Sequence, residues 1–161
     1  MTSKLTSLAR RVGGVVVILL ALGPAVIVAA PVAQASAPRS ATLINYEHRV
    51  IALVNVQRVR YGLGRLAQTA CPDSYAKGWA AYLASTGYFY HRSMMSFLNG
   101  CGAQRVAENI ARGDVSADGI VAAWMASPGH RANILDGRLT HIGIGAVYAR
   151  GGWTVDTDFS R

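Results

Sequence analysis

The sequence predicts an α+β domain with helices in the first two thirds of the chain and strands at its end. Apolar residues recur at helical spacing in three segments before residue 127. Residues 140–159 instead alternate between apolar and small or polar side chains, as strands do. Helices followed by strands indicate a layered arrangement, and 161 residues suit one domain better than two large ones.

The first 35 residues are predicted to be a signal peptide. A basic start is followed by uncharged, apolar residues 12–30, and Ala33-Gln-Ala35 fits a small-x-small cleavage site. The alternative is an uncleaved membrane anchor, because the apolar run is about long enough to span a bilayer. Residues 36–41 are predicted to be a linker, and residues 42–161 the domain.

Two amphipathic helices are predicted in the first half of the domain. Residues 42–61 place apolar side chains on one face, with Glu47 and Arg58 among the polar residues of the other face. A second helix is predicted over residues 72–86, because its first residue is a proline and Gly87 follows its last.

The middle of the chain has fewer periodic signals. Residues 93–102 are predicted to be an irregular loop held by Cys101, and residues 105–110 a short strand or extended segment. Ser116 is a suitable N-cap for a third helix over residues 117–126.

The stretch from Trp124 to Leu135 ends that helix and begins another. Ser127 can act as the N-cap, and the proline after it fits the first helical position. His130 therefore lies in the first turn, where the helix dipole disfavours a cation. A neutral imidazole that acts as a ligand or base is favoured there.

The C-terminal residues are predicted to form a β-hairpin. Residues 140–149 and 153–159 alternate, and residues 150–152 contain two glycines that suit the turn. Gly143 and Gly145 share one face of the first strand, where they allow close approach of another backbone.

Charge and cysteine content limit the classes of function. The net charge is +8, but the arginines are scattered and not interleaved with aromatic residues, so no nucleic-acid surface is predicted. Cys71 and Cys101 are the two cysteines, and one disulfide is the simplest prediction in an oxidising compartment. It would close a loop of about 30 residues and contribute roughly 3–4 kcal/mol. Two free thiols are the alternative.

Three polar residues are candidates for a functional site. Glu108 lies among apolar neighbours, so its carboxylate is expected to be at least partly buried and paired. A structural glutamate that accepts backbone hydrogen bonds is the other interpretation. His91 follows an aromatic cluster, and His130 lies 22 residues after Glu108, so only the fold can bring the three together. His48 is interpreted as a surface residue, whereas His141 is ambiguous.

An ordered set of short motifs resembles the CAP superfamily (cysteine-rich secretory proteins, antigen 5 and pathogenesis-related proteins), in its bacterial secreted branch. The most specific is Ser127-Pro-Gly-His-Arg-Ala-Asn-Ile-Leu135. The resemblance covers about residues 44–160. The other motifs are Val54-Asn55-x-x-Arg58, Gly87-Tyr-Phe-Tyr-His91, Ala107-Glu-Asn-Ile-Ala111 and His141-Ile-Gly-Ile-Gly145, with Trp153 and Asp158-Phe159.

The resemblance implies a three-layer α-β-α sandwich with a central antiparallel sheet. It also implies a cleft in which His91, Glu108 and His130 can hold zinc or another divalent cation. Many eukaryotic members have a second glutamate where this chain has Ser127, which argues against acid–base catalysis. Asn109 is expected to shape its loop and not to react.

The favoured interpretation is a secreted or cell-envelope protein that interacts with a small-molecule, lipid or cell-wall ligand and can bind a divalent cation. A metal-assisted peptidase or cell-wall hydrolase, with Glu108 as its base, is one alternative. A lipid-binding module is another. No nucleic-acid partner is expected, and contact with a membrane is expected only through residues 1–35 if they stay uncleaved.

Overall fold

The computed structural model describes residues 40–161. The predicted signal peptide (1–35) and most of the predicted linker (36–41) lie outside the described residues. No helix in residues 40–161 is long and apolar enough to cross a membrane. The helices and strands, in chain order, are α1 (Ala41–Arg60), β1 (Ala67–Gln68), α2 (Ala70–Thr86), α3 (Met95–Gly100), β2 (Val106–Gly113), α4 (Ala117–Ala126), α5 (Pro128–Ile134), β3 (His141–Ala149) and β4 (Gly152–Ser160).

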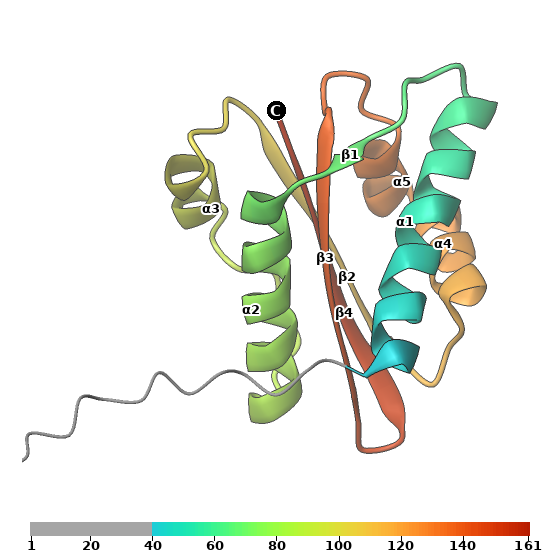
Figure 1. Ribbon diagram of the computed structural model, residues 1–161, viewed down its shortest axis with the longest axis vertical. Helices are drawn as coiled ribbons and strands as arrows, with labels where there is room; N and C mark the ends of the chain where they lie inside the picture. The colour runs from blue at the N-terminus through green and yellow to red at the C-terminus, as the bar shows by residue number, and fades with distance from the viewer. Residues whose placement is uncertain (1–39) are drawn as a thin grey trace, which may run out of the picture. The chain divides into compact units, whose positions relative to one another are not determined.

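The strands form one sheet in the order β1-β3-β4-β2. The hairpin partners β3 and β4 are antiparallel, as are β4 and β2, with Glu108 opposite Asp158. In Figure 1, α2 and α3 lie on one side of the sheet, and α1, α4 and α5 lie on the other. The predicted α-β-α sandwich is therefore confirmed. The two-residue β1, which pairs parallel with β3, was not predicted.

The main hydrophobic core lies between the sheet and the helices α1, α4 and α5. Alternation along β3 and β4 turns one set of side chains toward these helices, as the sequence predicted. Each fully buried aliphatic or aromatic side chain contributes about 1.5–3 kcal/mol relative to exposure. The core consists of Tyr46, Val50, Ile51, Val54, Leu66, Ala117, Ile120, Val121, Trp124, Ile134, Leu139, Ile142, Ile144, Ala146, Val155 and Phe159.

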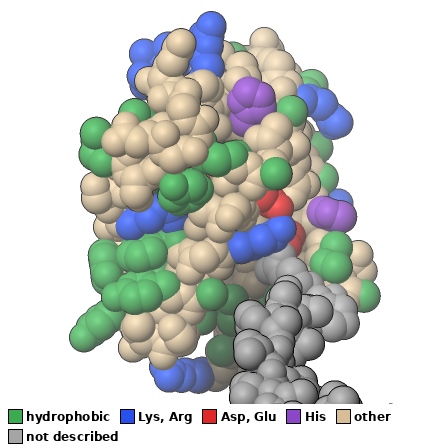
Figure 2. Space-filling model, turned by 60° about the vertical axis from the view of Figure 1, so that its left-hand side comes forward, with side chains coloured by type: hydrophobic (Ala, Val, Ile, Leu, Met, Phe, Trp, Pro, Cys, Tyr) green, Lys and Arg blue, Asp and Glu red, His purple; other side chains and the backbone are tan. Residues whose placement is uncertain are grey.

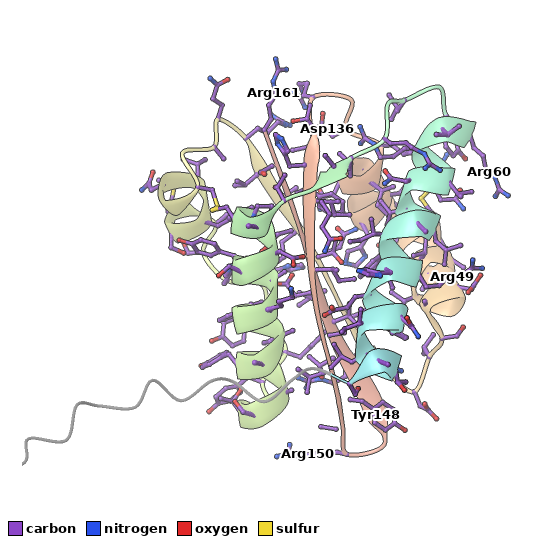
Figure 3. All side chains as sticks on the ribbon, in the orientation of Figure 1. Arg49, Arg60, Asp136, Tyr148, Arg150 and Arg161 are labelled. Atoms are coloured by element: carbon purple, nitrogen blue, oxygen red, sulfur yellow. A yellow bond between two sulfur atoms is a disulfide. The ribbon has the colours of Figure 1, made fainter. Side chains whose placement is uncertain are left out.

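Two residues assigned to the polar face of the first helix are buried in the structure. Arg58 is 2% exposed and donates to the carbonyls of Gly64, Ile134, Asp136 and Leu139. Glu47, which is 4% exposed, accepts from the backbone N–H of Ala146. Helical periodicity placed these side chains wrongly, because it holds no information on backbone groups from distant segments. Arg49 and Arg60 do point away from the sheet (Figure 3).

The face of the sheet opposite the main hydrophobic core lies close to α2. A Cβ atom at Gly143 would lie 2.1 Å from the backbone nitrogen of Asp73, and one at Gly145 would lie 2.3 Å from the carbonyl oxygen of Ala76. Glycine at both positions is thus required for this packing, as the sequence predicted.

The segment between α2 and β2 is more regular than predicted. Residues 93–102 were expected to be an irregular loop, but they contain α3, whose Phe97 is fully buried. The short strand predicted over residues 105–110 extends to Gly113 because it pairs along its length with β4. The disulfide between Cys71 and Cys101 is confirmed and ties the start of α2 to the end of α3.

Candidate functional site

A histidine and a buried carboxylate form the centre of the site. His91 lies in the segment between α2 and α3, and Glu108 lies on β2. The Nδ1 of His91 donates to Oε2 of Glu108 at 2.6 Å. The imidazole is 56% exposed and the glutamate side chain only 2% exposed. This bond fixes the ring and directs its second nitrogen, Nε2, away from the carboxylate.

His130 reaches the same place from the first turn of α5. The centroids of its ring and that of His91 are 6.4 Å apart. Burial lowers the pKa of His130, and the nearby His91 lowers it further. The Nδ1 of His130 lies 2.9 Å from Oγ of Ser127, which precedes the helix but makes no side-chain bond to its backbone. The serine therefore orients the histidine, and the ring is favoured in its neutral form.

Two asparagines hold α5 against β2. Asn109 donates to the carbonyl oxygen of His130 at 3.1 Å. Asn133 donates to the carbonyl oxygen of Glu108 at 3.0 Å and to Oδ1 of Asn109 at 2.9 Å. Asn109 was expected to shape a loop, but the structure places it on β2, where it bonds to α5. These bonds set the distance between the strand that carries the glutamate and the helix that carries the second histidine.

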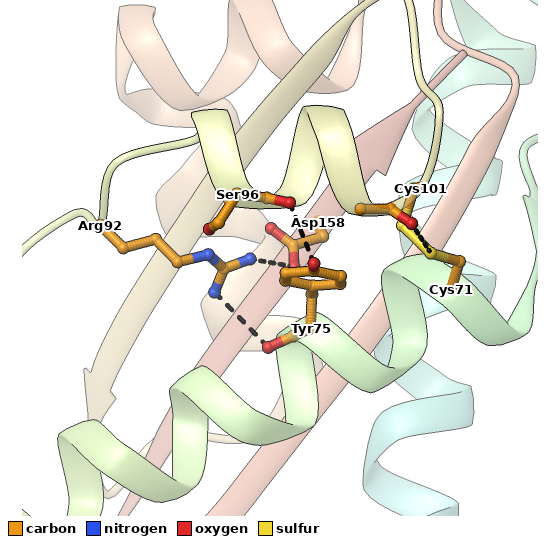
Figure 4. Close-up of a disulfide and its surroundings, with 7 residues drawn as sticks. Cys71, Tyr75, Arg92, Ser96, Cys101 and Asp158 are labelled. Carbon is orange, nitrogen blue, oxygen red and sulfur yellow. Dashed lines mark hydrogen bonds and ion pairs between the residues drawn. A yellow bond between two sulfur atoms is a disulfide. The ribbon is translucent and has the colours of Figure 1, made fainter.

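A buried ionic cluster, which was not predicted from the sequence, lies directly beneath the glutamate. Arg92 is 9% exposed and extends between α2 and the sheet (Figure 4). Its guanidinium pairs with Asp156 at 2.8 Å and with Asp158, both on β4, and lies 3.4 Å from Glu108. His91 and Arg92, which are neighbours in the chain, thus contact the two oxygens of the Glu108 carboxylate. The missed signal was the pair of aspartates two residues apart on one strand face.

The cluster holds more negative than positive charge. Burial raises the pKa of Asp158 to about 7. Burial, together with the charges of Asp158 and Glu108, also raises the pKa of Asp156. One guanidinium cannot balance three buried carboxylates, so the cluster retains a proton near neutral pH.

The three carboxylates also have the composition of a metal site. One oxygen from each of Glu108, Asp156 and Asp158 lies within 4.8 Å of the others, and such a triad could hold a metal ion. However, the Arg92 guanidinium already pairs with both aspartates and supplies the cation. The nitrogen donors of His91 and His130 lie outside this triad.

The other two histidines do not contribute to the site. His48 is exposed on α1, across the sheet from Glu108, as predicted. The Nδ1 of His141 lies 3.1 Å from Oγ1 of its neighbour Thr140 at the start of β3. Of the four histidines, the structure brings together the two that were proposed as ligands.

Comparison with known proteins gives one family. The model of the cysteine-rich secretory protein family, CAP, matches residues 51–157. The Bacillus subtilis protein YkwD is 36% identical over 128 residues, and the B. subtilis membrane protein YlbC is 31% identical over 106 residues. These matches cover 74% and 62% of this chain but 48% and 31% of the relatives, so the chain spans at most about half their length.

Solved structures share the fold. An extracellular protein with an SCP domain from Bacillus anthracis has a TM-score of 0.65 at 25% identity, over 78% of this chain and 45% of that one. An outer surface protein of Borrelia burgdorferi has a TM-score of 0.65 at 18% identity, over 70% and 89%. NaASP2, solved with Zn²⁺, has a TM-score of 0.52 at 13% identity, over 71% and 78%. The chain belongs to the cysteine-rich secretory protein (CAP) family.

Proposed function

We propose that this chain is a secreted interaction module in which His91 and His130 bind a divalent cation, with zinc as the first candidate, and Glu108 holds His91 in place. The observation that carries the proposal is the pairing of His91 with the buried carboxylate of Glu108, opposite a second histidine whose pKa is lowered. The structures of an extracellular relative and of a relative with Zn²⁺ support it.

The residues present fit zinc chemically. Both rings use Nδ1 for a partner within the protein, Glu108 for His91 and Ser127 for His130, which leaves Nε2 of each as a ligand. Glu108 supplies negative charge and sets the orientation of His91, the usual role of a carboxylate beside a metal-binding histidine. A bound zinc ion with few protein ligands would keep positions open for a water or a ligand group.

Ser127 lies beside Nδ1 of His130, but interaction is favoured over catalysis because no carboxylate in residues 40–161 is hydrogen-bonded to that histidine to orient it as a base. Both cysteines there are in the disulfide, and Ser127 occupies the position of the second acid found in many eukaryotic members. Activity on peptides or peptidoglycan that is lost in Glu108→Gln with the fold intact would replace this proposal by a metal-assisted hydrolase. A lipid that co-purifies with the exported protein in native mass spectrometry would favour a lipid-binding module.

Calorimetry with zinc tests the metal centre. Titrations of the full-length chain and of His91→Ala and His130→Ala should show binding that weakens at least about tenfold in each variant, because each loses one nitrogen ligand. His48→Ala and His141→Ala are matched controls, since both remove a histidine outside the site, and they should bind as the unaltered chain does. Equal affinity in all five proteins would rule out this centre.

A further inference from the structure

Six exposed or half-buried arginines lie at one end of the domain, where α1 and α5 end and where β2 and β3 begin. They come from segments far apart in the chain, which is why the sequence alone showed them as scattered. Figure 3 places two of them at the upper end of the molecule together with Asp136, and Figure 2 shows Lys and Arg side chains at the same end. This arginine end consists of Arg60, Arg65, Arg105, Arg131, Arg138 and Arg161.

Two of these arginines share one carboxylate, and a third is their neighbour. The Nε atoms of Arg105 and Arg138 lie 2.6 and 2.9 Å from the two carboxylate oxygens of Asp136. The backbone N–H of Arg161 donates to the carbonyl oxygen of Arg105 at 3.0 Å. One negative charge is therefore set against three positive charges in this part of the arginine end.

A tyrosine joins α5 to the end of α1. Arg131 donates to the hydroxyl of Tyr61 at 3.0 Å, and its guanidinium lies 5.0 Å from the centroid of that ring. Tyr61 directly follows Arg60, the last residue of α1. The contact thus brings the arginines of two helices to the same end of the domain.

The buried Arg58 holds two of the loops together. Its guanidinium donates to the carbonyl oxygen of Gly64, next to Arg65, and to that of Leu139, next to Arg138. The backbone that carries these two exposed arginines is therefore fixed before any ligand arrives. A surface that is ordered in advance loses less entropy on binding.

The arginine end carries all the net positive charge of the described domain. Residues 40–161 contain 12 Lys and Arg residues and eight Asp and Glu residues, a net charge of +4 with the histidines neutral. The six arginines and Asp136 together contribute +5, so the remaining residues sum to −1. Asp73, which bonds to Gln68 of β1, is already paired with Lys77.

Three guanidinium groups at this end have no carboxylate partner among the described residues. Arg60, Arg65 and Arg161 are exposed and form no ion pair within residues 40–161. Each guanidinium offers five N–H donors in a planar fork, which matches the oxygens of a phosphate group. Donors on several separate segments suit a chain that carries many phosphates better than they suit one small anion.

We infer that the arginine end binds a linear phosphodiester polymer without bases, such as a chain of polyol phosphates. The inference rests on the proposed role of the chain as an interaction module, but not on its metal centre. Each free arginine pairs with the oxygens of one phosphate, and the spacing of the segments lets successive phosphates of a flexible chain be bound. The attraction is electrostatic and therefore depends on salt.

Nucleic acid and membrane surfaces fit this end less well. Bases of a single strand stack on aromatic rings, but residues 58–66, 103–106 and 130–140 contain Tyr61 as their one Phe, Trp or Tyr. That ring already contacts the Arg131 guanidinium. Interfacial membrane segments combine basic residues with several large apolar side chains, whereas these segments expose only Val59, directly before them, and Tyr61.

Calorimetric titration of the full-length chain with synthetic poly(glycerol phosphate), in the presence of a chelator, tests the inference. Polyglycerol without phosphate is the matched ligand and should not bind. Affinity for the charged polymer should fall about a hundredfold between about 50 and 200 mM salt, because about five arginines release counterions from the phosphates. With divalent metal removed, failure of the proposed metal centre would not affect this result.

Two double variants locate the site. Arg60→Gln with Arg65→Gln removes two unpaired charges from the arginine end and should weaken binding at least about tenfold. Arg49→Gln with Arg150→Gln is the matched control, because it removes the same charge from exposed residues in the middle of α1 and in the β3–β4 turn (Figure 3). The control should change the affinity less than about threefold, since salt screens charges this far away.

Four results would overturn the inference. They are no binding of the charged polymer, equal binding of polyglycerol, equal losses in the two double variants, and tighter binding to phosphatidylglycerol vesicles or single-stranded DNA than to the polymer. Zinc affinity measured without the chelator should be unchanged in Arg60→Gln with Arg65→Gln. The two sites can therefore fail independently.

Discussion

The α1 face of the sheet is packed with hydrophobic side chains, whereas its α2 face carries three carboxylates, an arginine and two bare glycines. On the α1 face, Ile144, Val155 and Phe159 are fully buried in the main core. On the α2 face, the same strands present Asp156 and Asp158 to the Arg92 guanidinium. Period-two alternation thus gives one strand, β4, two opposite environments.

The α1 face of the sheet mainly stabilises the fold, whereas the α2 face shapes the candidate site. Hydrophobic burial on the α1 face stabilises the fold, and it depends little on pH. Buried charges on the α2 face contribute little net stability, but they fix the carboxylate of Glu108 on which His91 depends. Variants on the two faces should therefore differ both in how much they lower the free energy of unfolding and in how that loss depends on pH.

Removal of a core ring should have the largest effect. Phe159→Ala on the α1 face is expected to lower the free energy of unfolding by about 3–5 kcal/mol, because it deletes a fully buried side chain and leaves a cavity. Urea denaturation at pH 7 and pH 4 measures the loss. The two values should agree, and a loss confined to one pH would contradict the division between the faces.

Replacement of Arg92 on the α2 face should destabilise the protein to an extent that depends on pH. Arg92→Met is expected to cost about 3 kcal/mol at pH 7, because it leaves the aspartates and Glu108 without a counter-charge. The cost should shrink at pH 4, where the raised pKa values of the two aspartates keep them protonated and neutral. The same denaturation series measures it, and an equal loss at both pH values would show that packing dominates at this position.

A methyl group between β3 and α2 should have an intermediate effect. Gly145→Ala is expected to cost about 2 kcal/mol, because the new Cβ would lie 2.3 Å from the backbone of Ala76 and α2 must shift. Gly78→Ala, on the open side of the same helix, is the matched control and should be neutral or slightly stabilising. Thermal unfolding of both variants decides the point. Equal melting temperatures would remove the argument for close approach.

Per pH unit, the smallest effect concerns the slope of stability against pH. Burial raises the pKa of Asp158 from 3.8 to about 7, so between these values the folded protein holds a proton that the unfolded chain releases. Stability contributed by this group is present at low pH and is lost as pH rises through that window, by at most about 1.4 kcal/mol per pH unit. Asp158→Asn should therefore reduce the decrease in the free energy of unfolding as pH rises from 4 to 7.

The control for this slope is Asp118→Asn on α4. Asp118 is exposed, and its hydrogen bond to Arg49 lowers its pKa. Its contribution to the pH dependence of stability therefore lies below the pH range in which Asp158 contributes. Denaturation from pH 4 to pH 7 should give the same slope for this variant as for the unaltered chain. A slope that does not change in Asp158→Asn would contradict the proton assigned to the cluster.

Local patterns in the sequence were enough for most elements of the fold. The helix predicted over residues 117–126 and the hairpin at the C-terminus both occur, because helical spacing, an N-cap at Ser116 and strict alternation are properties of short segments. The α3 helix escaped prediction because it is only six residues long and its apolar residues show no period. Its position depends on Phe97 and on the disulfide.

The candidate site, like the fold, was only partly predicted from the sequence. Its three proposed residues, His91, Glu108 and His130, follow from family motifs, and the structure brings them together. The pairing of Arg92 with Asp158 was missed because 66 residues separate them in the chain, and the Asp158-Phe159 motif does not show what the aspartate contacts.

The sequence by itself determined the family, the layered α-β-α architecture, the disulfide and the three candidate site residues. These depend on short-range periodicity, on the presence of two cysteines and on short family motifs. The tertiary structure alone decided which charged side chains are buried, namely Arg58 between loops and Arg92 beneath the glutamate. A charged residue is buried only where distant segments supply its partners, and a linear pattern holds no information on those contacts.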